Sequence, residues 1–347
     1  MEGKALRWGI ILLVLFVLTV AVAIVSMAMG PASVAPGEVV AILASKVPGL
    51  GGLVSPTWSK GSEDIVTAIR LPRVLLGLLV GASLGLAGVT TQGVFRNPMA
   101  DPYILGISSG AALGASVVIL AGFGAGLSSY GIVAGAFAGA LVGAFLVFYI
   151  ARTQRRAPVE TLLLAGIAVS AFFSAITYFL MYVSGRKLNQ IVFWVMGALW
   201  NSTWSDVALL APFLLVGGVV VYAFARDLNV MVLGEEDATH LGTDVPRTRT
   251  ILLVASALLA AAAVAVSGII GFVGLIIPHM MRLVLGPDHR VLIPASLLVG
   301  ASFLTLADTF ARTVMQPSEM PVGIVTAAIG APFFVYLLAR RKRGASA

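Results

Sequence analysis

The sequence predicts an all-α polytopic membrane protein, a single domain over residues 1–347 with about ten transmembrane helices. Of its residues 59% are hydrophobic and 11% are charged, and the mean hydropathy is +1.03, whereas a soluble chain carries about 25% charged residues. Apolar runs of about 20 residues, the length needed to cross a bilayer, recur along the chain. The Lys and Arg residues gather in the short stretches between these runs. Such clusters are typical of the inner loops of membrane proteins and not of a nucleic-acid-binding face.

The first expected helix follows Lys4 and Arg7 and covers about 8–29. A signal peptide is the alternative, but its apolar core would have only about 7–15 residues, so we expect a retained helix. Prolines, glycines and acidic residues interrupt the apolar pattern over residues 30–69, which predicts an external loop.

Nine further apolar runs complete the ten spans, and the polar segment 184–204 is expected to lie at the membrane interface with its tryptophans. The nine runs cover about 72–92, 103–121, 131–150, 159–183, 207–225, 250–266, 271–285, 292–310 and 322–338. An even number of spans puts both termini on one side. With the termini inside, 15 of the 22 Lys and Arg residues lie inside. We therefore predict a multi-pass protein of the cytoplasmic membrane with both termini cytoplasmic.

Glycines recur at helical spacing on two of the expected helices. Such ridges let neighbouring helix backbones approach closely, so they predict a tightly packed bundle. They are Gly77, Gly81, Gly85 and Gly88 on the second helix, and Gly106, Gly110 and Gly114 on the third.

Several site types are excluded or disfavoured. The chain has no cysteine, which excludes disulfides and thiolate chemistry, and its three histidines are too scattered to suggest a metal site. The fifteen Asp and Glu residues fall in loops or near helix ends, with Asp308 the most buried candidate. An ion-coupled carrier usually holds its ion at a carboxylate inside the membrane, so this class remains only as an alternative. No GxxxxGK[ST] loop is present, so ATP hydrolysis by that route would need another chain.

Three blocks of sequence carry a family resemblance. The first runs from RLPR through the turn QGVFRNPMADP to LGISSGAALGA, the second is GIIGFVGLIIPHMMRLVLGPDHR, and the third is LADTFART followed by EMPVGIVTAAIGAPFFVYLL. Together they resemble the FecCD family, the permease subunits of ATP-driven importers for iron chelates, haem and vitamin B12. The motif residues are Gln92, Arg96, Asn97, Pro98, Asp101, Pro102, Pro278, His279 and Arg282.

The resemblance implies the BtuC-like fold of type II ABC importers. It also implies two copies of an ATP-binding subunit, an extracytoplasmic substrate-binding protein and a second permease chain, identical or similar to this one. No cofactor, metal or catalytic residue is expected.

Within the cytoplasmic stretch 226–249, the segment LGEEDATHLGTDV over 233–245 looks like two short helices around Gly242. From the residues alone, a solvated acidic loop and a docking segment are about equally favoured. The resemblance implies a coupling helix that docks on the ATPase subunit. Its candidate residues are Leu233, Gly234, Glu235, Glu236, Asp237, Ala238, Leu241 and Gly242.

Arg70, Arg73 and Arg312 are expected at the outer ends of their helices. Taken singly, each would be a snorkelling interfacial arginine. The resemblance implies that they pair with glutamates of the binding protein, which sets orientation and encounter rate.

The resemblance further implies that the fifth and tenth helices line the pathway at a two-fold axis, with an inner gate at 158–161. Hydroxyls in membrane helices often bond their own backbone instead. The candidates are Pro158, Val159, Glu160, Thr161, Ser170, Ser174, Thr177 and Thr326.

The segment FWVMGALWNSTW resembles a Trp-x-x-Gly-x-Leu pattern of iron-chelate members. We therefore expect a ferric siderophore as cargo, with haem and cobalamin as alternatives.

Overall fold

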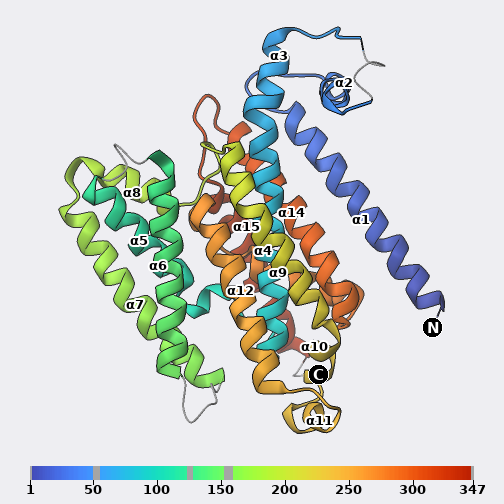
Figure 1. Cartoon of the computed structure of the whole chain (residues 1–347), viewed down its shortest axis with the longest axis vertical. Coiled ribbons are helices and arrows are strands. Elements are labelled where there is room, and N and C mark those ends of the chain that lie inside the picture. Colours follow the sequence, from blue (N-terminus) through green and yellow to red (C-terminus); the bar gives the residue numbers. More distant parts are fainter. Residues whose placement is uncertain (1, 50–54, 123–127, 152–158, 345–347) are drawn as a thin grey trace.

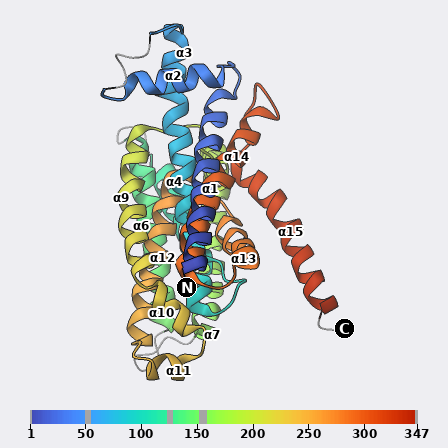
Figure 2. The same cartoon turned by 90° about the vertical axis from the view of Figure 1, so that its right-hand side faces the viewer.

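The computed structural model describes residues 2–49, 55–122, 128–151 and 159–344, and this part of the chain is a bundle of helices without strands (Figures 1 and 2). Seven helices are long and apolar enough to cross a membrane and three shorter ones are also apolar, so each of the ten predicted spans corresponds to a helix. The helices are α1 (Glu2–Ala28), α2 (Pro36–Lys46), α3 (Lys60–Asp64), α4 (Leu71–Phe95), α5 (Ile107–Ala121), α6 (Ser128–Ala151), α7 (Val159–Val183), α8 (Leu188–Val195), α9 (Trp204–Ala223), α10 (Ala225–Met231), α11 (Glu235–His240), α12 (Val245–Ser267), α13 (Val273–Leu285), α14 (His289–Thr313) and α15 (Val322–Gly344).

Helix α4 is the axis of the bundle, and α9, α12, α13 and α14 pack around it. A Cβ atom added to Gly81 would lie 2.2 Å from the carbonyl oxygen of Gly300, and one added to Gly88 would lie 1.9 Å from that of Gly274. The backbones of α13 and α14 therefore touch the backbone of α4 directly. This confirms the predicted glycine ridge.

The outer part of α4 extends further than the sequence predicts. A π-helical turn (Ile65–Arg70) joins α3 to α4, so one helix of 36 residues runs from Lys60 to Phe95, roughly 54 Å at 1.5 Å per residue. The predicted start near residue 72 is too late because α3 is polar and lies outside the apolar run. Ser59 caps this polar start, where its Oγ accepts a hydrogen bond of 3.0 Å from the Ser62 amide.

The predicted external loop 30–69 contains α2 and α3. Glu63 of α3 links the two helices, because it pairs with Lys46 of α2. It also accepts a 3.1 Å hydrogen bond from the indole of Trp58, which precedes α3.

Helices α5, α6 and α7 form a second group beside the axis, in green on the left of Figure 1. Glycines again allow close contact, because a Cβ atom on Gly114 would lie 2.0 Å from the Gly135 oxygen. A short 3₁₀ helix (Pro102–Leu105) precedes α5, and Gly106 turns the chain between them at a φ of 74°. The prediction of one helix over 103–121 is therefore too long by this turn.

Both ends of the chain lie toward the end of the bundle that carries α11, while α2 and α3 lie at the opposite end (Figures 1 and 2). We call the α11 end the inner end and the α2–α3 end the outer end, following the predicted topology. Helix α15 leans away from the bundle toward the inner end (Figure 2).

Candidate functional site

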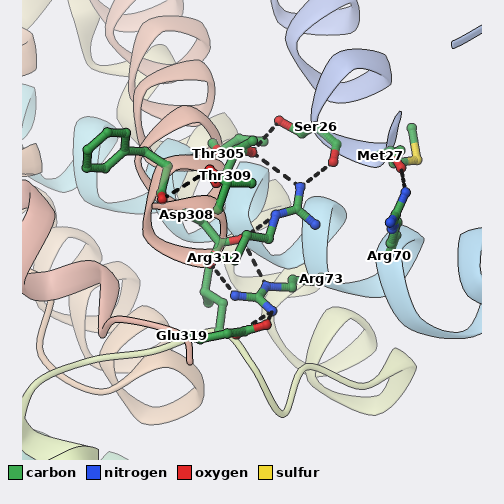
Figure 3. A network of polar contacts seen from close by, with 12 residues as sticks. Ser26, Met27, Arg70, Arg73, Thr305, Asp308, Thr309, Arg312 and Glu319 are labelled. Atoms are coloured by element: carbon green, nitrogen blue, oxygen red, sulfur yellow. Dashed lines mark hydrogen bonds and ion pairs between the residues drawn. The ribbon is translucent and has the colours of Figure 1, made fainter. Parts of the chain in front are cut away.

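Three charged side chains meet at the outer end in what we call the outer ion cluster: Arg73, Asp308 and Glu319 (Figure 3). Arg73 donates to Asp308 from Nε at 2.9 Å and from Nη2 at 2.8 Å. Its Nη1 donates to Glu319 at 2.8 and 3.1 Å. Forked arginine–carboxylate pairs of this kind fix geometry as well as energy. The cluster thereby ties α4, α14 and the α14–α15 loop together.

Two further arginines fasten α1 to the same region (Figure 3). Arg312, one turn after Asp308, donates to the Ser26 carbonyl oxygen of α1 and has its Nε 4.0 Å from the Asp308 carboxylate. Arg70 donates to the Met27 carbonyl oxygen at 2.6 Å. The carbonyl groups at the end of α1 thus receive donors from the π-helical turn before α4 and from α14.

The arginines predicted to dock a binding protein are buried: Arg70, Arg73 and Arg312 are 4%, 7% and 4% exposed. Arg312 lies in the last turn of α14, as predicted, whereas Arg70 and Arg73 lie within the continuous helix from Lys60 to Phe95 and not at its end. The sequence does not anticipate that their guanidinium groups are bonded within the chain. A buried charge needs such partners, so direct contact with a second protein requires an exchange of partners.

The first two motif blocks meet near the inner end. Gln92 of α4 donates from Nε2 to the Leu275 carbonyl oxygen at 2.9 Å and accepts a 3.2 Å hydrogen bond from Arg282 of α13. Arg96 ends α4 in the left-handed region at a φ of 49°. These residues join helices and turn the chain.

The other motif residues shape the turns of the same blocks. The Asn97 side chain accepts from the Met99 amide at 2.9 Å, and Asp101 accepts from the Tyr103 amide at 2.8 Å. Pro98 lies in the turn after α4, Pro102 begins the 3₁₀ helix, and Pro278 and His279 lie within α13.

The predicted coupling segment forms α10, α11 and the start of α12. The expectation of two short helices around Gly242 is wrong in one respect. The short helices α10 and α11 lie on either side of Gly234, and the helix after Gly242 is the long α12. Both glycines adopt positive φ, 130° and 89°, and so end their turns without Cβ strain.

The coupling segment presents apolar and acidic side chains at its surface. Leu233 and Leu241 are 61% and 60% exposed, and Glu236 and Asp237 are also exposed. Ala238 is buried against α10 and α12. Glu235 pairs with Arg249 of α12 and lies 4.0 Å from Arg96 at the end of α4. The segment is therefore anchored to α12 and to the end of α4. Its exposed leucines and carboxylates remain accessible to another protein.

The pathway candidates divide into two groups. Pro158 lies outside the described residues, Val159 begins α7, Glu160 is exposed, and Thr161, Ser170 and Ser174 are half-buried. Thr177 and Thr326 are buried, and their hydroxyls donate to the carbonyl oxygens of Phe173 and Gly323 within their own helices. That these two hydroxyls line a pathway therefore stays a prediction, with both of them bonded to their own helices in this chain.

A cavity of about 220 Å³ lies at the outer end beneath α8. The predicted interfacial tryptophans Trp194 and Trp200 line it, together with Gln190, Asn201 and Asp206.

The sequence alone does not predict two contacts, one near each end of the bundle. The first is the pairing of Arg73 with Asp308 and Glu319. The expected burial of Asp308 indicates a nearby cation, but Arg73 lies far from both carboxylates in the sequence. Asn229 of α10 donates to Asp288 at 2.8 Å and accepts from the His289 amide at 2.8 Å, which links the coupling segment to α14.

The chain is similar to transport proteins over most of its length. The model of the FecCD transport family matches residues 15–340. The cobalamin import system permease protein of Halobacterium salinarum is 48% identical over 81% of this chain and 75% of its own length. The hemin transport system permease protein of Yersinia pestis is 41% identical, covering 82% and 87%.

A solved structure shows the same arrangement of helices. A metal-chelate type ABC transporter in an inward-facing conformation is similar at a TM-score of 0.82 and 34% identity, over 95% of this chain and 99% of that chain.

Proposed function

This chain belongs to the FecCD transport family and is the permease subunit of an ABC importer, and we propose that it carries a metal chelate inward using ATP hydrolysed by a separate subunit. The observation that carries the proposal is the coupling segment. It presents exposed Leu233, Leu241 and carboxylates while Glu235 and Ala238 anchor it. An ATPase groove lined by apolar and basic groups would suit this surface.

The ion-coupled carrier is the weaker alternative. Such a carrier needs an ionisable group inside the membrane whose charge is free to hold the coupling ion. Asp308 is the buried carboxylate best placed for that role, but Arg73 already compensates its charge with two hydrogen bonds.

For the cargo we propose a metal chelate, with cobalamin as the first compound to test. The 48% identity to a cobalamin permease supports this choice. The Trp-x-x-Gly-x-Leu pattern at 194–199 supports a ferric siderophore, and the hemin permease at 41% identity supports haem.

The proposed assembly contains two permease chains, two ATPase subunits and an extracytoplasmic binding protein. A second permease against α7 and α15 would cover Phe172, Tyr182, Ile329 and Tyr336, which are exposed in the single chain. In this assembly the loaded binding protein docks at the outer end. ATP-driven closure of the partner subunits then moves the two coupling segments, and access alternates between the two sides.

The test is a pull-down of the tagged permease solubilised in detergent from its source membrane together with the extracytoplasmic extract. The ATPase activity of the complex is measured, as is binding of labelled cobalamin, ferric siderophore and haem to the recovered binding protein. We expect an ATPase and one preferred ligand. A permease that comes down alone, and transports solute in vesicles under an ion gradient, would contradict the proposal.

A further inference from the structure

The two carboxylates of the outer ion cluster differ in their hydrogen bonds to Arg73 and in their exposure to solvent (Figure 3). Asp308 accepts from two nitrogens of Arg73, and its side chain is 5% exposed. Glu319 accepts from Nη1 alone, and its side chain is 29% exposed. The same guanidinium therefore has one enclosed partner and one partner that water can reach.

Glu319 also sits where it can leave without disturbing a helix. It lies in the α14–α15 loop, in which residues 314–318 are exposed. A backbone hydrogen bond of 3.1 Å from the Met320 amide to the Ala311 oxygen holds the loop next to it. Within the described part of the chain, Glu319 makes the only ion pair of this loop.

The other buried charges of the region do not offer such a position. Arg70 and Arg312 donate to backbone oxygens of α1, and Asp308 lies inside the helix contact. Removing any of those partners would leave a charge buried without compensation.

We propose that the place of Glu319 on Arg73 is an exchangeable carboxylate site, which an acidic side chain of the binding protein takes over on docking. This inference rests on the proposed function. The bond that breaks and the bond that forms are of one kind, so the exchange needs no unpaired charge at its end. Glu319 competes as an intramolecular ligand, which lowers the partner's apparent affinity by the fraction of chains in which the site is free. Its displacement also removes the ion pair between α4 and the loop that leads into α15.

The first arm of the test uses the permease alone. Glu319→Ala removes the cover from Nη1 of Arg73, and Asp64→Ala removes one exposed carboxylate from the same outer end as the matched control. Each detergent-solubilised protein is treated with phenylglyoxal, and the modification of Arg73 is quantified by peptide mass spectrometry. We expect several-fold faster modification of Arg73 in the Glu319→Ala variant than in the wild type or Asp64→Ala. Equal rates in all three proteins would overturn the proposal.

The second arm measures affinity for the binding protein recovered in the pull-down above, in low salt. Because Arg73 is no longer occupied in the Glu319→Ala variant, we expect this variant to bind the binding protein more tightly than the wild type, on the order of threefold to tenfold. Asp64→Ala makes the same change in net charge and so reports the long-range electrostatic part alone. Equal tightening by both variants would refute the exchange and leave the proposed function standing. A wild-type permease that binds no such protein would refute the proposed function and this inference with it.

Discussion

Burial raises the pKa of Asp101, in the turn between α4 and α5, from 3.8 to about 6, although the hydrogen bond from the Tyr103 amide opposes the shift. Because this folded-state pKa lies above the ordinary value, the folded chain binds the proton more tightly than the unfolded chain does. Stability is therefore expected to rise as the pH falls from about 6 toward 4, and to be lower at pH 7.

Replacing Asp101 by asparagine should remove this pH dependence. A pKa of about 6 against 3.8 corresponds to about 3 kcal/mol, and we expect about half of this because the side chain is partly exposed. The amide oxygen of the new side chain can still accept the hydrogen bond from Tyr103. The measurement is thermal unfolding in detergent between pH 4.5 and 7.5. An Asp101→Asn variant that keeps the wild-type slope would show that another group titrates.

Among the elements, the contact of α4 with α13 and α14 depends on backbone meeting backbone. Such a contact leaves no side chain that could rotate to make room. The cost of replacing a glycine by alanine should therefore depend on the distance from the added Cβ atom to its nearest neighbour. This distance differs between two glycines of the same ridge.

Gly88→Ala should destabilise the bundle strongly, because the new Cβ would lie 1.9 Å from the Gly274 oxygen. We expect about 3 kcal/mol or more, or failure to accumulate in the membrane. Gly77→Ala is the matched control, since its nearest neighbour is the Thr305 hydroxyl at 3.3 Å. The midpoint of thermal unfolding compares the two variants. Equal losses would mean that helix separation absorbs the added methyl group.

The coupling segment is the second element whose role can be tested by itself. Leu233→Ser with Leu241→Ser removes its two most exposed leucines without touching the anchors Glu235 and Ala238. We expect tenfold or greater loss of ATPase recruitment with little change in stability. Val40→Ser, at 47% exposure on α2, also replaces an exposed aliphatic side chain by serine, but at the outer end, and should have no effect on recruitment. Unchanged recruitment in the double variant would move the docking surface elsewhere.

For the whole molecule, the ten spans place α11 and both chain ends opposite α2 and α3. The absence of cysteine makes this topology easy to test with single substitutions. Thr57→Cys should react with an impermeant maleimide in intact cells, whereas Thr239→Cys should react only after the inner membrane is opened. Both residues are exposed. Labelling of Thr239→Cys from outside would invert the orientation.

Much of this architecture could be predicted from local sequence. Apolar runs predict the seven long and three shorter apolar helices. The spacing of Gly81 and Gly88 predicts a close helix contact. Local patterns could not predict the partner of Arg73, because Glu319 lies 246 positions away and only the packed bundle brings them together. Nor could they reveal that α3 extends α4, since polar residues with a capping serine carry no apolar signal.

The continuous helix from Lys60 to Phe95 connects the outer end of the molecule to its inner end. Tilting a rod of roughly 54 Å by about 10° around its middle would move its tips by about 5 Å in opposite directions. Its outer tip is Lys60, and its inner tip is followed by Arg96, beside Glu235. A small tilt about the middle of the helix would thus move its outer start and the contact with the coupling segment in opposite directions.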